Sequence, residues 1–290
     1  MQEIKPGIYY ETRYPGVVLG ALILPRGTIM IDAPLRVEDG RAWRATLLNR
    51  GGGIDRLLIN LDAHPDRTIG VRFMECPVVA HTRADQVFRS RSATFKSQGS
   101  DAGAEWETCN DLGSSRWALP DFTFTDQMQF NWGLVDVLLE HHPGPAPGAT
   151  WVILPQAKVV FVGDVVLSGQ PPFLAEADLN AWVESLGELL TPAYRSYTLV
   201  SGRSGIVSLE DVRKQRTFLN DVMARLDKIW ARGGSAEETE KLVGKLLDKL
   251  ELPGDRRSLY ESRLRYGLIR LFNRRLRRSE EIESTEDKDE

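Results

Sequence analysis

Short apolar segments alternate with amphipathic ones through the first half of the chain, and no other feature constrains its fold as much. Residues 16–24 and 28–31 are rich in apolar and β-branched side chains, and the turn residues Pro25–Gly27 separate them, which predicts a hairpin of two strands. The apolar residues of 38–50 have helical spacing, and an apolar run at 56–60 predicts the next strand. Strands and helices in alternation are typical of an α/β architecture.

The middle of the chain continues this pattern and then becomes richer in strands. A strand at 77–80 precedes a helix at 82–89, and the less regular residues 90–120 fit either an insertion or a lid over a site. Further strands are expected at 122–124, 135–140, 150–154 and 158–162. Because consecutive strands joined by tight turns usually pair antiparallel, we expect mixed sheets in two layers with helices outside.

The last third of the chain is helical by its spacing, with helices expected at 209–230, 236–250 and 258–278. We therefore divide the chain into a domain of residues 1–230, a helical extension of residues 231–278 and an acidic tail of residues 279–290. The tail has seven acidic residues against one lysine, which indicates disorder. The last helix carries an apolar stripe, which needs burial against the parent domain or in a homodimer: Leu264, Leu268, Leu271 and Phe272.

Composition narrows the class of protein. Lys and Arg number 37 against 41 Asp and Glu, and the resulting net charge of -4 argues against a nucleic-acid partner. No run approaches the ~18 apolar residues of a membrane-spanning helix. Cys76 and Cys109 allow one bridge at most, and the first residues lack the basic start and apolar run of a signal peptide. A cytoplasmic protein is the expectation.

Four polar segments each follow an apolar strand, which is where α/β proteins usually place their sites. They are 62–67, 141–148, 163–164 and 201–205. In the first, Asp62, His64 and Asp66 offer carboxylate and imidazole ligands at alternate positions, a donor set that suits Zn, Mn or Fe.

The order and spacing of these segments resemble the metallo-β-lactamase superfamily, whose members are αββα sandwiches that usually hold two metal ions. Residues 62–67 fall on its H-x-H-x-D-H loop, and residues 143–148 fall on its P-G-H-T-P-G segment. Gly163 and Asp164 fall on the strand end that supplies a bridging carboxylate, and residues 201–205 fall on the last P-G-H-G turn. The resemblance covers roughly residues 4–230 and implies a four-layer αββα fold followed by the helical extension.

The resemblance also implies seven metal-ligand positions, and most of them are altered. In chain order they hold Asp62, His64, Asp66, Arg67, Pro145, Asp164 and Arg203. His64, Asp66 and Asp164 match the family's ligand types, and Asp62 is a substitute carboxylate. Pro145 has no side-chain donor atom, and a guanidinium group stays protonated with no lone pair to give.

The residues at the altered positions carry opposite charges that could balance one another. If Asp62, Asp66 and Asp164 converge as in the family, their charges repel unless cations lie between them. Arg67 and Arg203 would supply two positive charges, leaving the cluster at one negative charge, or about neutral with a protonated His64. We therefore expect a salt-bridge cluster of these aspartates and arginines in place of the metals.

Two functions follow from these residues. The first is a protein that is not a competent zinc hydrolase, has no metal cofactor and keeps its cleft as a binding or scaffolding surface for a small molecule or a protein. The alternative is a metal-dependent hydrolase of an ester, thioester, lactone or phosphoester that holds one Zn, Mn or Fe ion on Asp62, His64 and Asp164. Asp66 is then a candidate general base, and His142 flanks the cleft.

Overall fold

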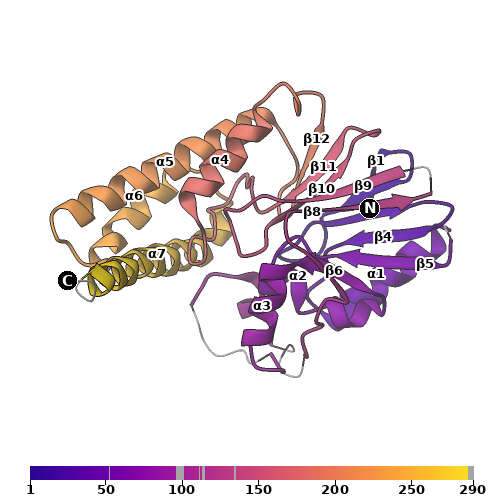
Figure 1. Ribbon diagram of the computed structural model, residues 1–290, viewed down its shortest axis with the longest axis horizontal. Coiled ribbons are helices and arrows are strands. Elements are labelled where there is room, and N and C mark those ends of the chain that lie inside the picture. Colours follow the sequence, from indigo (N-terminus) through magenta and orange to yellow (C-terminus); the bar gives the residue numbers. More distant parts are fainter. Residues whose placement is uncertain (52, 96–100, 111, 113–114, 134, 287–290) are drawn as a thin grey trace.

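The computed structural model describes the chain except for residues 52, 96–100, 111, 113–114, 134 and 287–290. Two sheets lie face to face, and helices cover their outer faces (Figure 1). Within the described residues no helix is both long and apolar enough to span a bilayer.

The first sheet contains seven strands in the order of the sequence, from β1 to β7. β1 to β4 pair antiparallel, whereas β4 to β7 pair parallel through helical crossovers. Its strands are β1 (Gln2–Lys5), β2 (Ile8–Glu11), β3 (Leu19–Ile23), β4 (Gly27–Ile31), β5 (Asp55–Ile59), β6 (Val78–His81) and β7 (Phe122–Phe124).

The second sheet has the order β13-β12-β11-β10-β9-β8 and is antiparallel except for the parallel pair β11–β12. Its strands are β8 (Gln127–Trp132), β9 (Val135–His141), β10 (Thr150–Leu154), β11 (Val159–Gly163), β12 (Thr198–Ser201) and β13 (Gly205–Val207).

The helices connect and cover these sheets. The α-helices are α1 (Val37–Asn49), α2 (Pro65–Thr68), α3 (Thr82–Ser90), α4 (Leu179–Leu189), α5 (Leu209–Ala231), α6 (Val243–Leu247) and α7 (Arg257–Glu286). Short 3-10 helices occupy Val71–Met74, Glu105–Thr108, Ala236–Leu242 and Gly254–Arg256.

Alternation along the strands sorts the apolar side chains into layers. In β4, Ile29 and Ile31 pack between the two sheets, whereas Met30 packs on the outer face with Trp43 of α1. In β10, Val152 and Leu154 face the first sheet, whereas Trp151 and Ile153 face the helices. The four-layer αββα sandwich that the sequence predicts is thereby confirmed.

Some elements differ from the sequence-based expectation. That expectation includes no element at β1, β8 or α4. β1 is largely exposed, whereas β8 does alternate, with Met128, Phe130 and Trp132 on the core between the sheets. The expected helix at 236–250 is a 3-10 helix followed by the five-residue α6.

The C-terminal helix also differs from the prediction of a disordered tail. α7 continues to Glu286, because the glutamates beyond residue 278 are good helix formers, and residues 287–290 lie outside the described part. Its apolar stripe is buried within the chain: Leu264, Leu268 and Phe272 share one core with Trp151 of the second sheet. Packing on the parent domain therefore accounts for most of the stripe.

Candidate functional site

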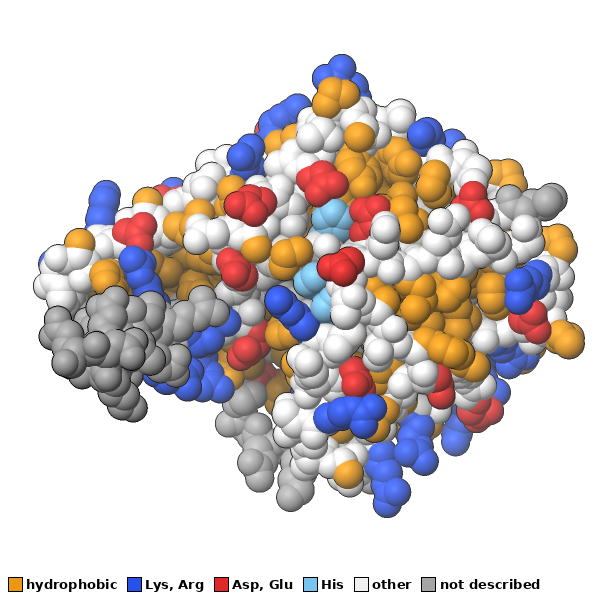
Figure 2. Space-filling model, viewed as in Figure 1, with side chains coloured by type: hydrophobic (Ala, Val, Ile, Leu, Met, Phe, Trp, Pro, Cys, Tyr) orange, Lys and Arg blue, Asp and Glu red, His pale blue; other side chains and the backbone are white. Residues whose placement is uncertain are grey.

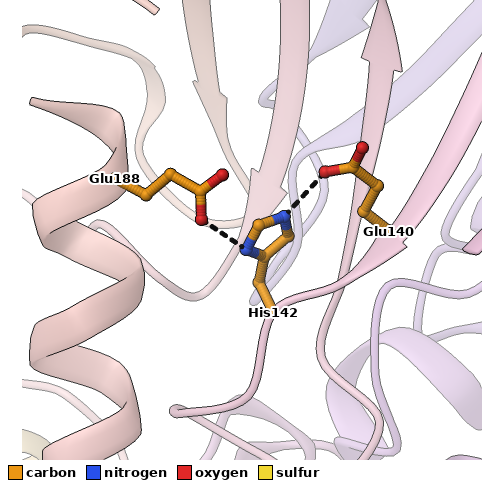
Figure 3. A group of neighbouring side chains, drawn as sticks. All are labelled: Glu140, His142 and Glu188. Atoms are coloured by element: carbon orange, nitrogen blue, oxygen red, sulfur yellow. Dashed lines mark hydrogen bonds and ion pairs between the residues drawn. The ribbon is translucent and has the colours of Figure 1, made fainter. Parts of the chain in front are cut away.

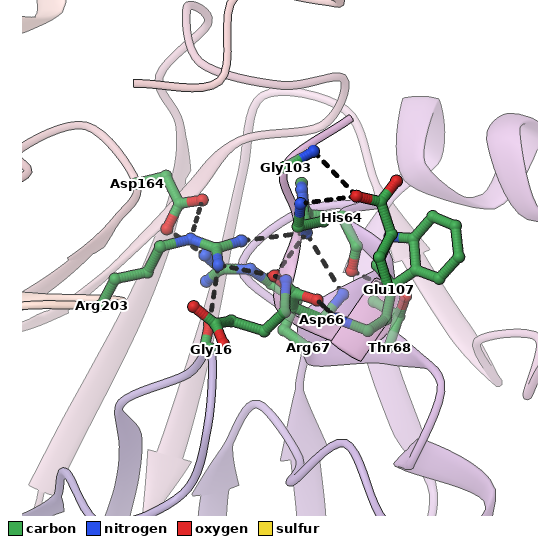
Figure 4. Close-up of polar contacts among 12 residues, drawn as sticks. Gly16, His64, Asp66, Arg67, Thr68, Gly103, Glu107, Asp164 and Arg203 are labelled. Carbon is green, nitrogen blue, oxygen red and sulfur yellow. Dashed lines mark hydrogen bonds and ion pairs between the residues drawn. The ribbon is translucent and has the colours of Figure 1, made fainter. Parts of the chain in front are cut away.

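The polar loops meet in one buried cluster of aspartates and arginines at the strand ends (Figure 4). Asp32 follows β4, Asp164 follows β11, and Arg203 lies in the turn between β12 and β13. Arg67 belongs to α2, whose first turn is capped by His64. Segments far apart in the sequence thus deliver opposite charges to one place.

Arg67 is fully buried and joins three carboxylates from three loops. Its Nη1 donates to Asp32 Oδ2 at 2.7 Å, and its Nε lies 3.0 Å from Asp62 Oδ1. Its Nη2 donates to Asp164 Oδ1. The guanidinium group therefore occupies the centre of the cluster.

Arg203 holds the other side of the cluster with an almost completely buried side chain. Its Nε donates to Asp164 Oδ2 at 2.8 Å, and its Nη1 donates to Asp66 Oδ2 at 2.7 Å and to the carbonyl of Gly16 at 2.8 Å. Both oxygens of Asp164 are thereby bound by guanidinium groups, one from each arginine.

Gly202 provides the space that Arg67 requires. A Cβ at this position would lie 2.7 Å from Arg67 Nη1 and 3.0 Å from the backbone carbon of Gly163. Neither neighbour can move easily, since Arg67 is held by three carboxylates. A side chain at residue 202 is therefore incompatible with the cluster as it stands.

Replacing this glycine tests that constraint. We expect Gly202→Ala to lower the free energy of unfolding by about 1–3 kcal/mol, the usual cost of overpacking. The matched control is Gly244→Ala in α6, where an added Cβ meets nothing within 4 Å. That change should stabilise by up to ~1 kcal/mol through helix propensity. Equal effects in urea unfolding would show that Gly202 is not a packing requirement.

Four carboxylates share two guanidinium groups, so the fully ionised cluster would carry two negative charges. The cluster expected from the sequence does not include Asp32, although this residue follows β4 where the family resemblance places a structural aspartate. Burial raises the pKa of Asp32, and burial together with Asp164 and Asp32 raises the pKa of Asp62 to about 6. Burial also raises the pKa of Asp66 and of Asp164. The charge of Arg203 and the hydrogen bonds that these two carboxylates accept outweigh burial and bring each pKa below its ordinary value. As the pH falls, the first pair therefore takes up protons before the second pair does.

His64 is neutral in this surrounding. Burial and the nearby Arg203 lower its pKa to about 3. Its Nδ1 is approached by the Asp66 amide at 3.2 Å and by Arg203 Nη2 at 2.9 Å, both of which are donors. The single lone pair of the neutral ring therefore lies on Nδ1, and the proton lies on Nε2. In this state His64 has no free nitrogen lone pair for a metal.

The donor set does not fit the dinuclear metal centre that the fold family implies. Arg67 and Arg203 already occupy both oxygens of Asp164, and Pro145 offers no donor. Asp62 Oδ2, buried and without a hydrogen-bond partner, is the oxygen of the cluster that a cation would find open. Two ions with four ligands each would require both arginines to leave.

Asp66 lies deep in the cluster. It is completely buried, and its oxygens accept from Arg203 and from the backbone amides of Glu105 and Trp106, at 3.3 Å and 2.8 Å. A carboxylate with a lowered pKa is a weak base. Its role as a general base stays a prediction that this environment disfavours. The irregular 90–120 region thus supplies backbone donors to the cluster.

His142 lies in a second group, with Glu140 and Glu188 (Figure 3). Its Nε2 lies 3.0 Å from Glu140 Oε2, and its Nδ1 lies 3.3 Å from Glu188 Oε2. The ring stacks on Trp151 at a centroid distance of 3.5 Å. Within the described residues its side-chain contacts go to these groups rather than to the cluster. Figure 2 shows histidines flanked by acidic side chains near the middle of one face.

His81 has a structural role at the start of α3. Its Nδ1 accepts from the Arg83 amide at 3.0 Å, its Nε2 lies 2.5 Å from the Thr125 carbonyl, and its ring stacks on His141 at 3.8 Å. Burial, and then the neighbouring His141, lower its pKa to about 4. The neutral ring is therefore the form that fits the fold.

This pKa predicts acid lability. The folded protein binds fewer protons at His81 than the unfolded chain between pH 6.5 and about 4, so stability falls as the pH falls through that window. One proton contributes a slope of about 1.4 kcal/mol per pH unit. His81→Asn, which can still cap the helix, should reduce the slope of unfolding free energy against pH by up to that amount. An unchanged slope would contradict this assignment.

A pocket of about 590 Å³ opens beside the cluster. His64, Pro145 and Phe173 line it, and Phe173 also lies against Arg203, with the guanidinium carbon 4.4 Å from the ring centroid. This volume is typical of a small-molecule site. The altered ligand position Pro145 therefore faces a cavity rather than the cluster's charged centre.

Comparisons with known proteins agree with this architecture. Residues 75–198 match the family model of the metallo-beta-lactamase superfamily. No curated protein sequence matches the chain. A metallo-beta-lactamase family protein from Thermus thermophilus is similar over 91% of this chain and 93% of its own, at 20% identity and a TM-score of 0.60. A metallo-beta-lactamase from Pontibacter korlensis matches over 76% and 97%, at 18% identity and a TM-score of 0.57.

One similar structure is a larger enzyme. The stereoselective inverting sec-alkylsulfatase Pisa1 from Pseudomonas sp. matches over 92% of this chain, at 16% identity and a TM-score of 0.64. This chain spans about half of that structure, 49% of its length. At such identities the similarity establishes the fold and leaves the chemistry to the site itself.

Proposed function

This chain has the metallo-β-lactamase superfamily fold, and from that premise we propose that it is a binding protein rather than a competent zinc hydrolase. The observation that carries the proposal is the pairing of both Asp164 oxygens with Arg67 and Arg203. Guanidinium groups neutralise the carboxylates as metal ions would, but they bind no water to be activated. The fold is thereby stabilised without the usual source of hydroxide.

The pocket beside the cluster is the proposed binding site. It combines aromatic and aliphatic walls with a few polar groups, as small-molecule sites do. The cluster beneath it is buried, so it contributes rigidity rather than contacts with a substrate. A pocket of this volume suits a small-molecule ligand better than it suits a protein partner.

A turnover assay tests the proposal. We expect no hydrolysis of a chromogenic ester or phosphodiester above the uncatalysed rate, with or without added Zn²⁺ or Mn²⁺. The control variant is His64→Ala, which removes an imidazole that every metal-dependent scheme at this cluster would use. A metal-dependent rate that is lost in His64→Ala would overturn the proposal.

The second candidate is a metal-dependent hydrolase with a single altered site. One observation at the cluster favours it: Asp62 Oδ2 is buried without a hydrogen-bond partner. The separate group of Glu140, His142 and Glu188, whose ligand atoms lie within 4.8 Å of one another, offers another place for an ion. A single ion on Asp62, His64 and Asp164 would require His64 to change its tautomer and Arg203 to move. That rearrangement makes it the weaker candidate.

A further inference from the structure

Two arginines that line the pocket are wholly or partly buried and have no carboxylate partner among the described residues. Arg263 comes from α7, and Arg91 follows the last residue of α3. This separates them from Arg67 and Arg203, whose guanidinium groups are held by aspartates. A buried cation without a counter-ion is costly, so its presence calls for a physical reason.

Arg263 is held in place by neutral groups. It is 1% exposed. Its Nε donates to the Gly103 carbonyl at 2.9 Å, and its Nη1 donates to Gln170 Oε1 at 2.9 Å and to the Pro171 carbonyl at 3.1 Å. The guanidinium carbon lies 3.9 Å from the Phe173 ring centroid. Its Nη2 is buried and has no hydrogen-bond partner.

Arg91 repeats this arrangement on another wall of the pocket. Its Nη2 donates to the Ala63 carbonyl at 2.8 Å, and the guanidinium carbon lies 4.5 Å from the Trp117 ring centroid. Its Nη1 is buried without a hydrogen-bond partner. Each arginine is therefore fixed by carbonyls and aromatic rings, and one of its two terminal nitrogens has no hydrogen-bond partner.

The charge of the pocket follows from its lining. Arg91, Arg263 and the exposed Arg270 are basic, whereas Glu176 is acidic, so the lining is positive in a chain of net charge -4. Burial lowers the pKa of both Arg91 and Arg263, each to about 10, which still leaves both charged at neutral pH. The surrounding walls, including Trp106, Phe173 and Pro147, are apolar.

We propose that this pocket binds a small organic oxyanion, whose carboxylate, phosphate or sulfate group accepts hydrogen bonds from Arg91 Nη1 and Arg263 Nη2. The apolar part of the ligand would pack against the aromatic wall. Guanidinium forks match the geometry of such oxyanions, and a desolvated pocket strengthens the pairing. The proposal rests on the binding role proposed above and assigns the chemical class of ligand.

Calorimetric titration with small probes tests it. The probes are benzoate, phenyl phosphate and phenyl sulfate, and neutral benzyl alcohol is the matched uncharged compound. We expect at least one anion to bind at least tenfold more tightly than benzyl alcohol, and the order among the three identifies the head group. Arg91→Gln should weaken that binding at least tenfold, whereas the exposed Arg213→Gln on α5 should leave it unchanged.

Arg263→Gln is informative only if circular dichroism shows that the variant folds. If it does not fold, Arg91→Gln still tests the site, because Arg91 is only half-buried. Binding of no anion, equal binding of benzyl alcohol, or full binding by Arg91→Gln would overturn the anion site. Those outcomes leave the proposed function standing if the protein is free of metal and turns over no substrate. Metal-dependent turnover would instead overturn the proposed function, whatever the anions do.

Discussion

Arg67→Met is expected to lower the free energy of unfolding by about 3–5 kcal/mol, or to prevent folding. Methionine has a similar length but leaves Asp32, Asp62 and Asp164 buried without their shared cation. Removing one partner of a buried ion pair costs this much because the remaining charge is uncompensated. Urea unfolding followed by circular dichroism measures the loss.

The matched control is Arg213→Met. Arg213 pairs with Glu210 at 3.3 Å on the surface of α5, and both side chains are more than half exposed. Exposed pairs contribute between zero and about 1 kcal/mol, so this variant should unfold almost as the parent does. Similar small losses in the two variants would contradict the central position given to Arg67.

A double-mutant cycle on Arg203 and Asp164 should show strong coupling. We expect Arg203→Gln and Asp164→Asn each to cost about 2–4 kcal/mol, because each leaves a buried charged group incompletely paired. Their combined cost should be smaller than the sum of the two by about 1–3 kcal/mol, as for residues that contact each other directly. Thermal unfolding of the four proteins at one pH gives the coupling energy.

The cycle on Arg213 and Glu210 is its reference. That surface pair should show coupling below about 0.5 kcal/mol. Additive losses at Arg203 and Asp164 would mean that the 2.8 Å contact between them contributes nothing specific, and the salt-bridge cluster would then be an incidental arrangement.

Much of the fold follows from local sequence patterns. Alternation in β4 and β10 assigns residues to the two faces of each sheet, so it predicts the layers. β8 was overlooked, although its apolar residues Met128, Phe130 and Trp132 alternate with polar ones and pack on the core between the sheets. The pattern fails at the end of α7, where acidic composition indicates disorder although glutamate favours helices.

The site was less accessible to sequence reasoning. Loop spacing and the resemblance pointed to Arg67, Arg203 and Asp164, since each stands at a ligand position of the family. No local pattern connects Arg263 with the site, because α7 lies far along the chain from the loops it contacts. The neutral tautomer of His64 depends on two donors that only the folded chain brings together.

The fold alone does not determine the function, because the function depends on the residues of the site. A sec-alkylsulfatase and metallo-beta-lactamases share this architecture, yet in this chain arginines occupy the space between the carboxylates. A protein can keep a fold while its site changes chemistry, provided that the buried charges remain balanced. Here Arg67 and Arg203 offset two of the four buried carboxylates.

Metal content is the most direct test of whether arginines have replaced the metal ions. The protein should be purified without chelator from medium containing zinc, manganese and iron, and then analysed by inductively coupled plasma mass spectrometry beside its His64→Ala variant. We expect no stoichiometric metal that depends on His64. About two tightly held equivalents per chain, lost in the variant, would contradict the replacement.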